Sequence, residues 1–139
     1  MSATVLYTPD VLALTIELAR YPLTEDLPLR AEARSRSCGS TMALGLAVDD
    51  GGAITRIGLR SHACAIGQAS AAIFAGNALG ASKDGLAAAH ASVKAWLAGE
   101  GGLPQWPGFD KISPARDYPA RHGAVLLPWE AAMQALSHS

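Results

Sequence analysis

Alternating apolar residues in the first half of the chain constrain the fold more than any other feature. Apolar side chains recur at every second position from Met42 to Val48, and a second apolar set follows in residues 54–59. Between the two sets lies Asp49-Asp50-Gly51-Gly52, a sequence typical of a tight turn. The pattern predicts a β-hairpin, and we expect a short polar strand at residues 34–37 to join its edge.

Helical spacing of apolar residues predicts the remaining elements. Residues 8–20 open with Thr8-Pro9-Asp10, an N-cap followed by proline at the first helical position. The other predicted helices run from Cys64 to Gly80, from Asp84 to Ala98, and from Pro119 to Leu136 with an interruption at Pro128, which begins a final helix. Residues 21–33 are predicted to form an extended connection, and residues 99–114 an ordered loop.

Strands followed by helices predict an α+β fold, with a small three-stranded antiparallel sheet and helices packed on one face. At 139 residues the chain is expected to form one domain over residues 1–139. Half of the residues are hydrophobic and 17% are charged, which is enough apolar material for a core and excludes a disordered chain.

Charge and hydropathy exclude several classes of protein. Eleven Lys and Arg residues against twelve Asp and Glu residues give a net charge of -1, which does not favour binding to nucleic acid or to an anionic membrane. No apolar run approaches the roughly 18 residues of a membrane-spanning helix, and the first residues do not have the pattern of a secretory signal. We therefore expect a cytoplasmic location, in which two cysteines remain thiols.

The two cysteines are the candidate functional residues. Cys38 lies just before the predicted hairpin, and Cys64 lies where the last strand passes into a helix. The first turn of a helix offers unpaired N–H groups and the positive end of the helix dipole, which favour an anionic sulfur. Cys64 is thus the better candidate for a reactive or metal-bound sulfur. Two thiols 26 positions apart match no zinc or redox signature, so burial of both as small apolar residues is the alternative.

Histidines supply further candidates. His62 lies two positions before Cys64, which in a strand places both side chains on one face, and His122 lies in the last helical region. Either can complete a Cys/His metal site, or be a surface histidine. A thiol-dependent enzyme with Cys64 as nucleophile and His122 as base is a further alternative, whereas phosphate-binding loops and a Gly-x-Ser-x-Gly motif are absent from the sequence.

Several motifs between Tyr7 and Leu136 together resemble one known family. They are Cys38-Gly39, the predicted hairpin, Cys64-Ala65-Ile66-Gly67-Gln68-Ala69-Ser70 at a helix start, and Tyr118-Pro119-Ala120-Arg121 followed by Leu127 and Trp129. In these motifs and their spacing the chain resembles the U-type iron–sulfur cluster assembly scaffolds, the family of the NifU N-terminal domain, IscU and SufU.

The resemblance implies a site and also two departures from it. In that family three cysteines and an aspartate hold a nascent [2Fe–2S] cluster, or zinc in its absence. Cys38 and Cys64 match two of the cysteines and are the implied cofactor-binding and metal-ligating residues. Ser40 occupies the position of the aspartate, Ala124 that of the third cysteine, and Gly123 that of a preceding histidine or lysine.

Two thiolates supply half of the four ligands that zinc and iron–sulfur clusters ordinarily take. Two routes complete the set: His62 or His122 of the same chain, or a homodimer that supplies Cys38 and Cys64 twice.

The resemblance implies a divergent scaffold, or a cluster- or sulfur-transfer protein, that is not an enzyme and has no catalytic residues. Its implied cargo is iron or a [2Fe–2S] cluster, with zinc as a further metal, and its implied partners are a cysteine desulfurase and apo iron–sulfur proteins. A metal-free interaction or sulfur-relay module of the same fold remains the alternative, beside the enzyme that uses Cys64.

Overall fold

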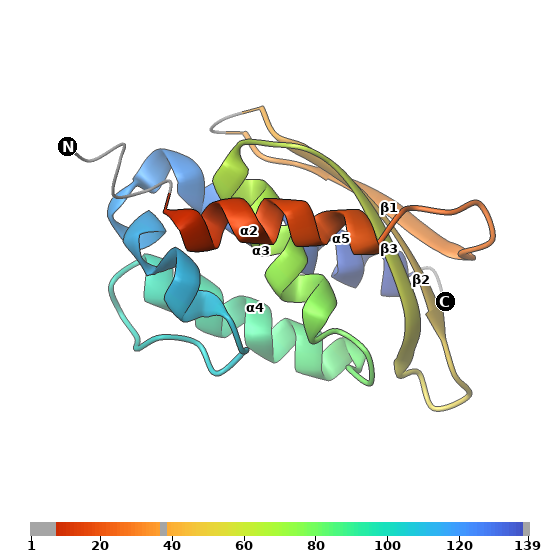
Figure 1. Ribbon diagram of the computed structural model, residues 1–139. Helices are drawn as coiled ribbons and strands as arrows, with labels where there is room; N and C mark the ends of the chain where they lie inside the picture. The colour runs from red at the N-terminus through yellow and green to blue at the C-terminus, as the bar shows by residue number, and fades with distance from the viewer. Residues whose placement is uncertain (1–7, 37–38, 138–139) are drawn as a thin grey trace.

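Three antiparallel strands and a layer of helices make up the structure, a computed structural model that describes residues 8–36 and 39–137 (Figure 1). The sheet has the order β1-β2-β3, formed by β1 (Leu29–Arg34), β2 (Thr41–Val48) and β3 (Ile54–His62). The helical elements are α2 (Pro9–Glu17), η1 (Leu18–Arg20), α3 (Ala65–Gly76), α4 (Lys83–Leu97), η2 (Phe109–Asp117) and α5 (Pro119–Leu136). The helices lie on one face of the sheet, where α5 packs against β1 and β2, which confirms the predicted α+β architecture (Figure 1).

The predicted hairpin is present. Met42, Leu44 and Leu46 of β2 are buried, as the period-two pattern requires. In the turn to β3, a carboxylate oxygen of Asp49 accepts hydrogen bonds from the backbone N–H groups of Gly51 and Ala53, both at 2.9 Å. The side chain that opens the turn therefore also satisfies its backbone donors.

The edge strand lies earlier than predicted. Strand β1 covers Leu29–Arg34 rather than residues 34–37, so the expected extended connection at residues 21–33 ends at Pro28. Its inner residues are Leu29, Ala31 and Ala33, whose short side chains make a weak hydrophobic signal. Pro28 precedes the first strand residue, a position where proline removes no ladder hydrogen bond.

The predicted N-cap of α2 is present, and α4 has an N-cap at Ser82 that was not predicted. The Thr8 side chain accepts a hydrogen bond from the Val11 N–H at 3.2 Å, and the Ser82 side chain accepts one from the Gly85 N–H at 3.1 Å. Each hydroxyl satisfies a donor that the first helical turn leaves unpaired.

Helix α3 is shorter than predicted, because it ends at Gly76 rather than at Gly80. The backbone of the following segment binds the start of β3 instead. The Gly80 N–H donates to the Ile54 carbonyl at 2.8 Å, and the Ile54 N–H donates to the Ala81 carbonyl at 3.0 Å. These long-range hydrogen bonds take residues 80 and 81 out of the helical path.

The predicted loop at residues 99–114 is irregular only in its first part, since η2 begins at Phe109. The loop is tied to α3 by Trp106, whose indole N–H donates to the Ile73 carbonyl at 3.0 Å and whose ring stacks on Phe74. Trp129 of α5 completes this aromatic cluster, with its ring centroid 5.4 Å from that of Trp106.

Helix α5 passes through Pro128 without interruption, so the expected separate final helix is not formed. A proline inside a helix costs about 3 kcal/mol, because it removes one hydrogen bond and crowds the preceding turn. Burial of a large apolar side chain stabilises by about 1.5–3 kcal/mol, and α5 fully buries Val125, Leu127 and Trp129. Packing on several sides of α5 therefore outweighs the cost of Pro128.

No helix within residues 8–36 and 39–137 is both long and apolar enough to cross a membrane.

Candidate functional site

Cys64 lies at the junction of β3 and α3. It is the N-cap residue of α3, with extended backbone angles (φ -63°, ψ 170°), and its carbonyl accepts the first helical hydrogen bond from the Gln68 N–H at 3.0 Å. Its thiol makes no capping hydrogen bond and is partly exposed. The sulfur therefore lies beside unpaired N–H groups at the positive end of the α3 dipole, as predicted.

The turn between β1 and β2 lies at the same end of the sheet as Cys64. Thr41 of β2 pairs with His62 of β3, and Ser40 precedes Thr41 directly. The turn closes through a hydrogen bond from the Ser35 N–H to the Ser40 carbonyl at 2.8 Å. Gly39 has φ +69°, a left-handed conformation that favours glycine, and nothing lies within 4 Å of where its Cβ would be. Cys38 lies outside the described residues, so its approach to Cys64 stays a prediction.

Ala124 contacts the beginning of α3 from α5. A Cβ atom at Gly67 would lie 3.2 Å from the Ala124 Cβ and 2.7 Å from the Ala63 Cβ. Helices α3 and α5 thus approach closely because Gly67 has no side chain. Ala124 is completely buried, and its methyl group offers no donor atom. The position that resembles the third cysteine of the family is therefore next to the helical turn that Cys64 begins.

Gly67 is a residue of the site beyond those predicted from the sequence motifs. The sequence contains a signal for this role. Glycine lowers the stability of a helix interior, and Gly67 is the single glycine in the run Cys64-Ala65-Ile66-Gly67-Gln68-Ala69-Ser70. A glycine retained in a small-residue helix indicates close packing against another backbone.

The three described histidines lie on three different elements, β3, α4 and α5. His62 is exposed at the end of β3, where it faces solvent. The Nε2 atom of His122 lies 2.8 Å from the Arg116 carbonyl, so this ring is held at the end of η2. His90 pairs with Glu130 at 3.2 Å, between α4 and α5. His138 lies outside the described residues.

The described residues do not assemble a metal site on their own. Within residues 8–36 and 39–137, no three side chains of the His, Cys, Asp and Glu types gather closely enough to hold a metal ion. No hydrogen bond joins His122 to Cys64 in this part of the chain either, and the His122 ring contacts the Arg116 carbonyl instead. Ser40 is buried, with 4% of its surface exposed.

The structure is that of a small α+β protein with its candidate site at one end of the sheet. A cysteine at a helix start and a glycine turn lie at this end, and α5 packs against the first turn of that helix. A NifU-like protein (N-terminal) from Brucella abortus, described as nitrogen-fixing, has a crystal structure that matches with a TM-score of 0.86 and 31% sequence identity. The match covers 99% of this chain and 96% of that one. The chain belongs to the NifU-like family of U-type scaffolds.

Two further solved structures share the fold. A putative iron–sulfur cluster assembly scaffold protein for the SUF system, from the thermophilic Fervidobacterium islandicum AW-1, matches with a TM-score of 0.83 and 22% identity over 95% of this chain and 97% of that one. A hypothetical protein matches with a TM-score of 0.68 and 18% identity over 91% of this chain and 96% of that one. No protein-family model matches the sequence, and no curated protein matches it significantly.

Proposed function

We propose that this protein, a single domain over residues 1–139, is a non-enzymatic scaffold of iron–sulfur cluster assembly. Its cargo is iron or a [2Fe–2S] cluster, with zinc as a further metal, held by the thiolates of Cys38 and Cys64. A cysteine desulfurase supplies the sulfur, and apo iron–sulfur proteins receive the product. The similar proteins from Brucella abortus and Fervidobacterium islandicum support this class of function.

The observation that carries the proposal is the position of the Cys64 thiol. It is partly exposed, makes no capping hydrogen bond and lies beside the unpaired N–H groups of α3. Such a sulfur is available to iron, to zinc or to another sulfur atom, unlike a cysteine buried as a small apolar residue.

The ligand set of one chain is incomplete, which supports a shared site. Ala124 supplies no donor, and the His122 ring is engaged with the Arg116 carbonyl. Two chains that each contribute Cys38 and Cys64 supply the four thiolates that a [2Fe–2S] cluster ordinarily takes. We therefore propose that the cluster is held between two copies of the chain.

Sulfur transfer to Cys64 is a balanced exchange. The Cys64 thiolate attacks the outer sulfur of a persulfide on the desulfurase, the sulfur–sulfur bond of the donor breaks, and the desulfurase cysteine leaves as a thiolate. A new persulfide forms on Cys64, and no oxidant or reductant is consumed.

Anaerobic reconstitution with iron and sulfide tests the proposal. The unmodified protein is expected to retain iron and acid-labile sulfide at one [2Fe–2S] cluster for two chains and to elute as a dimer. Cys38→Ala and Cys64→Ala are each expected to lose the cluster, whereas His90→Ala, a histidine variant remote from Cys64, retains it. Retention of the cluster by both cysteine variants would contradict the proposal, and a cluster on a monomer that is lost in His62→Ala would assign a third ligand to this histidine.

The alternative function is sulfur relay without metal, which is also compatible with the incomplete ligand set of one chain. In that case mass spectrometry detects a gain of one sulfur atom on Cys64 after incubation with a desulfurase and cysteine, while iron is not retained. If the unmodified protein carried neither iron nor a persulfide after these treatments, both functions would be excluded.

A further inference from the structure

The face of the sheet opposite the helices carries four arginines. Residues 30, 32 and 34 of β1 are exposed while their neighbours along the strand are half-buried, and Arg56 and Arg60 of β3 are exposed as well. The register aligns these residues in rows across the short residues of β2. One row is Arg30, Gly45 and Gly58, the next is Glu32, Ala43 and Arg60, and the last is Arg34, Thr41 and His62.

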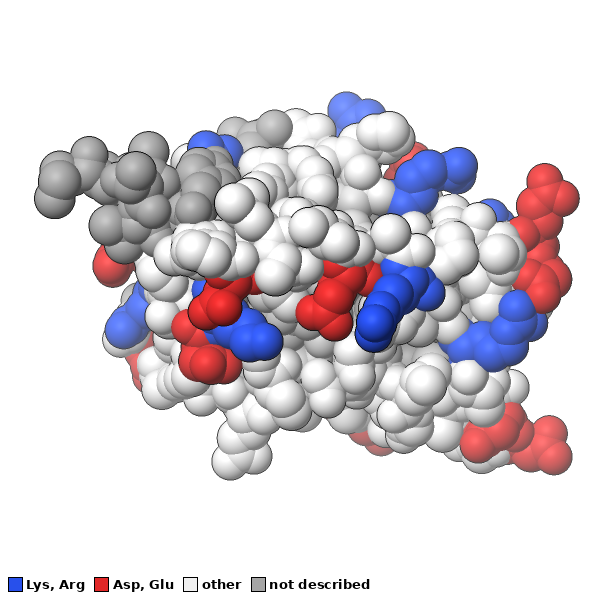
Figure 2. Space-filling view, in the orientation of Figure 1, with Lys and Arg blue, Asp and Glu red and all other residues white. Residues whose placement is uncertain are grey.

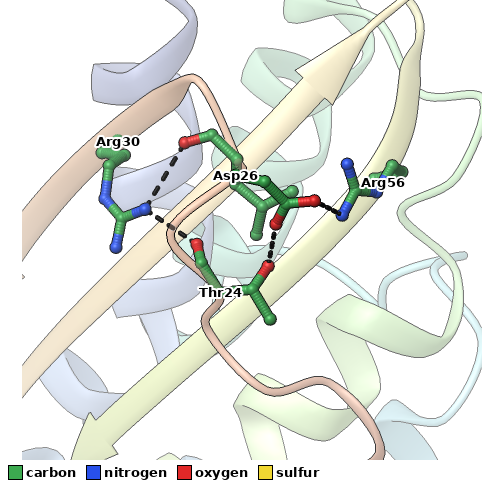
Figure 3. A network of polar contacts seen from close by, with 5 residues as sticks. Thr24, Asp26, Arg30 and Arg56 are labelled. Carbon is green, nitrogen blue, oxygen red and sulfur yellow. Dashed lines mark hydrogen bonds and ion pairs between the residues drawn. The ribbon is translucent and has the colours of Figure 1, made fainter.

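One half of this outer face is covered by the chain itself. Leu27 lies over Gly45 and Gly58 and is 2% exposed, and a Cβ at Gly58 would collide with the Pro22 carbonyl. Two arginines hold the covering segment in place (Figure 3). Arg30 donates to the Thr24 carbonyl at 2.8 Å, and Arg56 forms an ion pair with Asp26 at 2.6 Å.

The other half, which we call the open face, consists of Arg34, Thr41, Ala43, Arg60 and His62. Its two arginines and its histidine are exposed and make no hydrogen bond or ion pair with another described residue. Glu32 is the acidic residue beside them. The arginines of the sheet thus divide into two that bind the chain itself and two whose charges remain unpaired within residues 8–36 and 39–137.

The open face adjoins the candidate site. His62 ends β3 and Cys64 follows two residues later, so their Cα atoms are within about 7 Å of each other. The turn that contains Gly39 and Ser40 begins at the same row, beside Arg34 and Thr41. In Figure 2 blue side chains lie around the sheet at the upper right, with red side chains beside them.

We propose that the open face is a docking surface for an acidic, extended segment of the cysteine desulfurase that delivers sulfur to Cys64. This inference rests on the proposed function. Arg34 and Arg60 come from strands on either side of β2 and lie in neighbouring rows, so their Cα atoms are roughly 12 Å apart, with Thr41 and Ala43 between them. Carboxylates spaced at alternate positions of an extended segment can pair with both guanidinium groups, which are suited to bidentate binding.

A protein segment fits the open face better than nucleic acid does. The charged area is small and contains Glu32, and the chain as a whole has a net charge of -1. Nucleic-acid binding instead relies on many phosphate contacts over an extended basic surface. Complementary charge near the site also speeds encounter with the partner, an effect that salt weakens.

An NMR titration of the isotope-labelled full chain tests the docking surface. The probe is a capped eight-residue peptide of alternating Glu and Thr, and its Gln/Thr counterpart is the neutral control. Backbone shifts are expected at Arg34, Ala43 and Arg60, with affinity reduced about tenfold or more in R34E/R60E. The matched variant R20E/K94E has the same change in net charge on exposed residues of η1 and α4 and is expected to bind like the unmodified chain.

Three results would overturn the docking surface. They are equal affinity for the Glu and Gln peptides, equal binding by the two double variants, and tighter binding of an oligo-dT strand to the same residues. The last result would assign the face to nucleic acid.

A kinetic measurement separates this inference from the proposed function. Persulfide transfer from a purified cysteine desulfurase to Cys64 is expected to show a KM raised several-fold in R34E/R60E, at an unchanged kcat, and a loss of this difference at high salt. Cys64→Ala abolishes transfer but leaves peptide binding intact. Transfer that is insensitive to R34E/R60E would overturn the docking surface alone, and peptide binding without any transfer or cluster would overturn the proposed function alone.

Discussion

Ala124 of α5 lies against Gly67 of α3, where a side chain at position 67 would place its Cβ atom 3.2 Å from the Ala124 Cβ. This contact joins two helices far apart in sequence at the first turn after Cys64. It fixes the position of α5 relative to the candidate sulfur ligand. The same contact makes the site sensitive to changes of a single methyl group.

Gly67→Ala is expected to destabilise the protein by about 1–3 kcal/mol. The new Cβ would lie 2.7 Å from the Ala63 Cβ, and overpacking of this kind outweighs the roughly 1 kcal/mol that alanine gains over glycine in a helix. Urea unfolding measures the change. The control is Gly85→Ala in α4, where the site is exposed and the new Cβ is 3.4 Å from the Ser82 hydroxyl, so stability should rise by about 0.5–1 kcal/mol. A stabilised Gly67→Ala would contradict the close packing of α3 on α5.

Ser70→Ala is expected to cost about 1–2 kcal/mol of stability. The buried Ser70 hydroxyl donates to the Val125 carbonyl at 2.7 Å and so links α3 to α5. A buried hydrogen bond lost in this way leaves the carbonyl with one partner fewer. The shift of the thermal midpoint should exceed that of Ser92→Ala, an exposed serine of α4, and equal midpoints would show that the bond has no net effect.

Elements with their own periodic pattern could be predicted from the sequence. Strand β2 alternates apolar and other residues over Met42, Leu44 and Leu46, and α4 has both its Ser82 cap and its apolar spacing. The predicted position of β1 is wrong because the inner residues of this strand are mostly alanine, which gives a weak hydrophobic pattern. The predicted α3 is too long because Gly80 and Ala81 form hydrogen bonds with Ile54, a residue distant in sequence. Continuity of α5 through Pro128 depends likewise on burial from several sides.

In the candidate site, too, some features follow from local sequence and others depend on contacts between distant residues. Cys64 was identified from its place before a helical run, which is local information. The glycine at position 67 indicates a close approach, but its partner Ala124, like the cover that Leu27 forms over Gly58, is set by tertiary packing. The engagement of His122 with Arg116 is equally a consequence of how η2 ends.

Asp26→Asn is expected to lower stability slightly at neutral pH and not at low pH. The hydrogen bond from Thr24, followed by that from Arg56, lowers the pKa of the Asp26 carboxyl below its ordinary value of 3.8. A carboxyl with a lowered pKa stabilises the folded state above the unfolded-state pKa, and this contribution is lost as the pH falls through the folded-state pKa. Both residues are exposed, so the effect on the urea midpoint is small.

The measurement compares urea midpoints of Asp26→Asn and the unmodified protein between pH 6 and pH 2.5. The difference should be fully present at pH 6, begin to shrink near the ordinary carboxyl pKa of about 4, and be lost only as the pH falls through the lowered folded-state pKa of Asp26. Asp50→Asn, in the exposed turn after β2, controls for the loss of one negative charge. A difference that persists unchanged at pH 2.5 would have to arise from the amide itself.

Ala124→Cys is expected to increase zinc affinity, because it places a third thiol against the turn that Cys64 begins. With Ser40→Asp added, one chain offers three thiolates and a carboxylate, a complete tetrahedral set for zinc. Competition with a chelator should show binding at one zinc per chain, tighter than in the unmodified protein by about tenfold or more, in line with a gain of over 1.4 kcal/mol.

Ala132→Cys is the control, since it adds a thiol at another fully buried position of α5 and should leave zinc affinity unchanged. Removal of Cys64 from the Ala124→Cys variant should return the affinity to its original value. If Ala124→Cys and Ala132→Cys bind zinc equally, position 124 is not part of the site, and the sulfur-relay function is favoured over the scaffold.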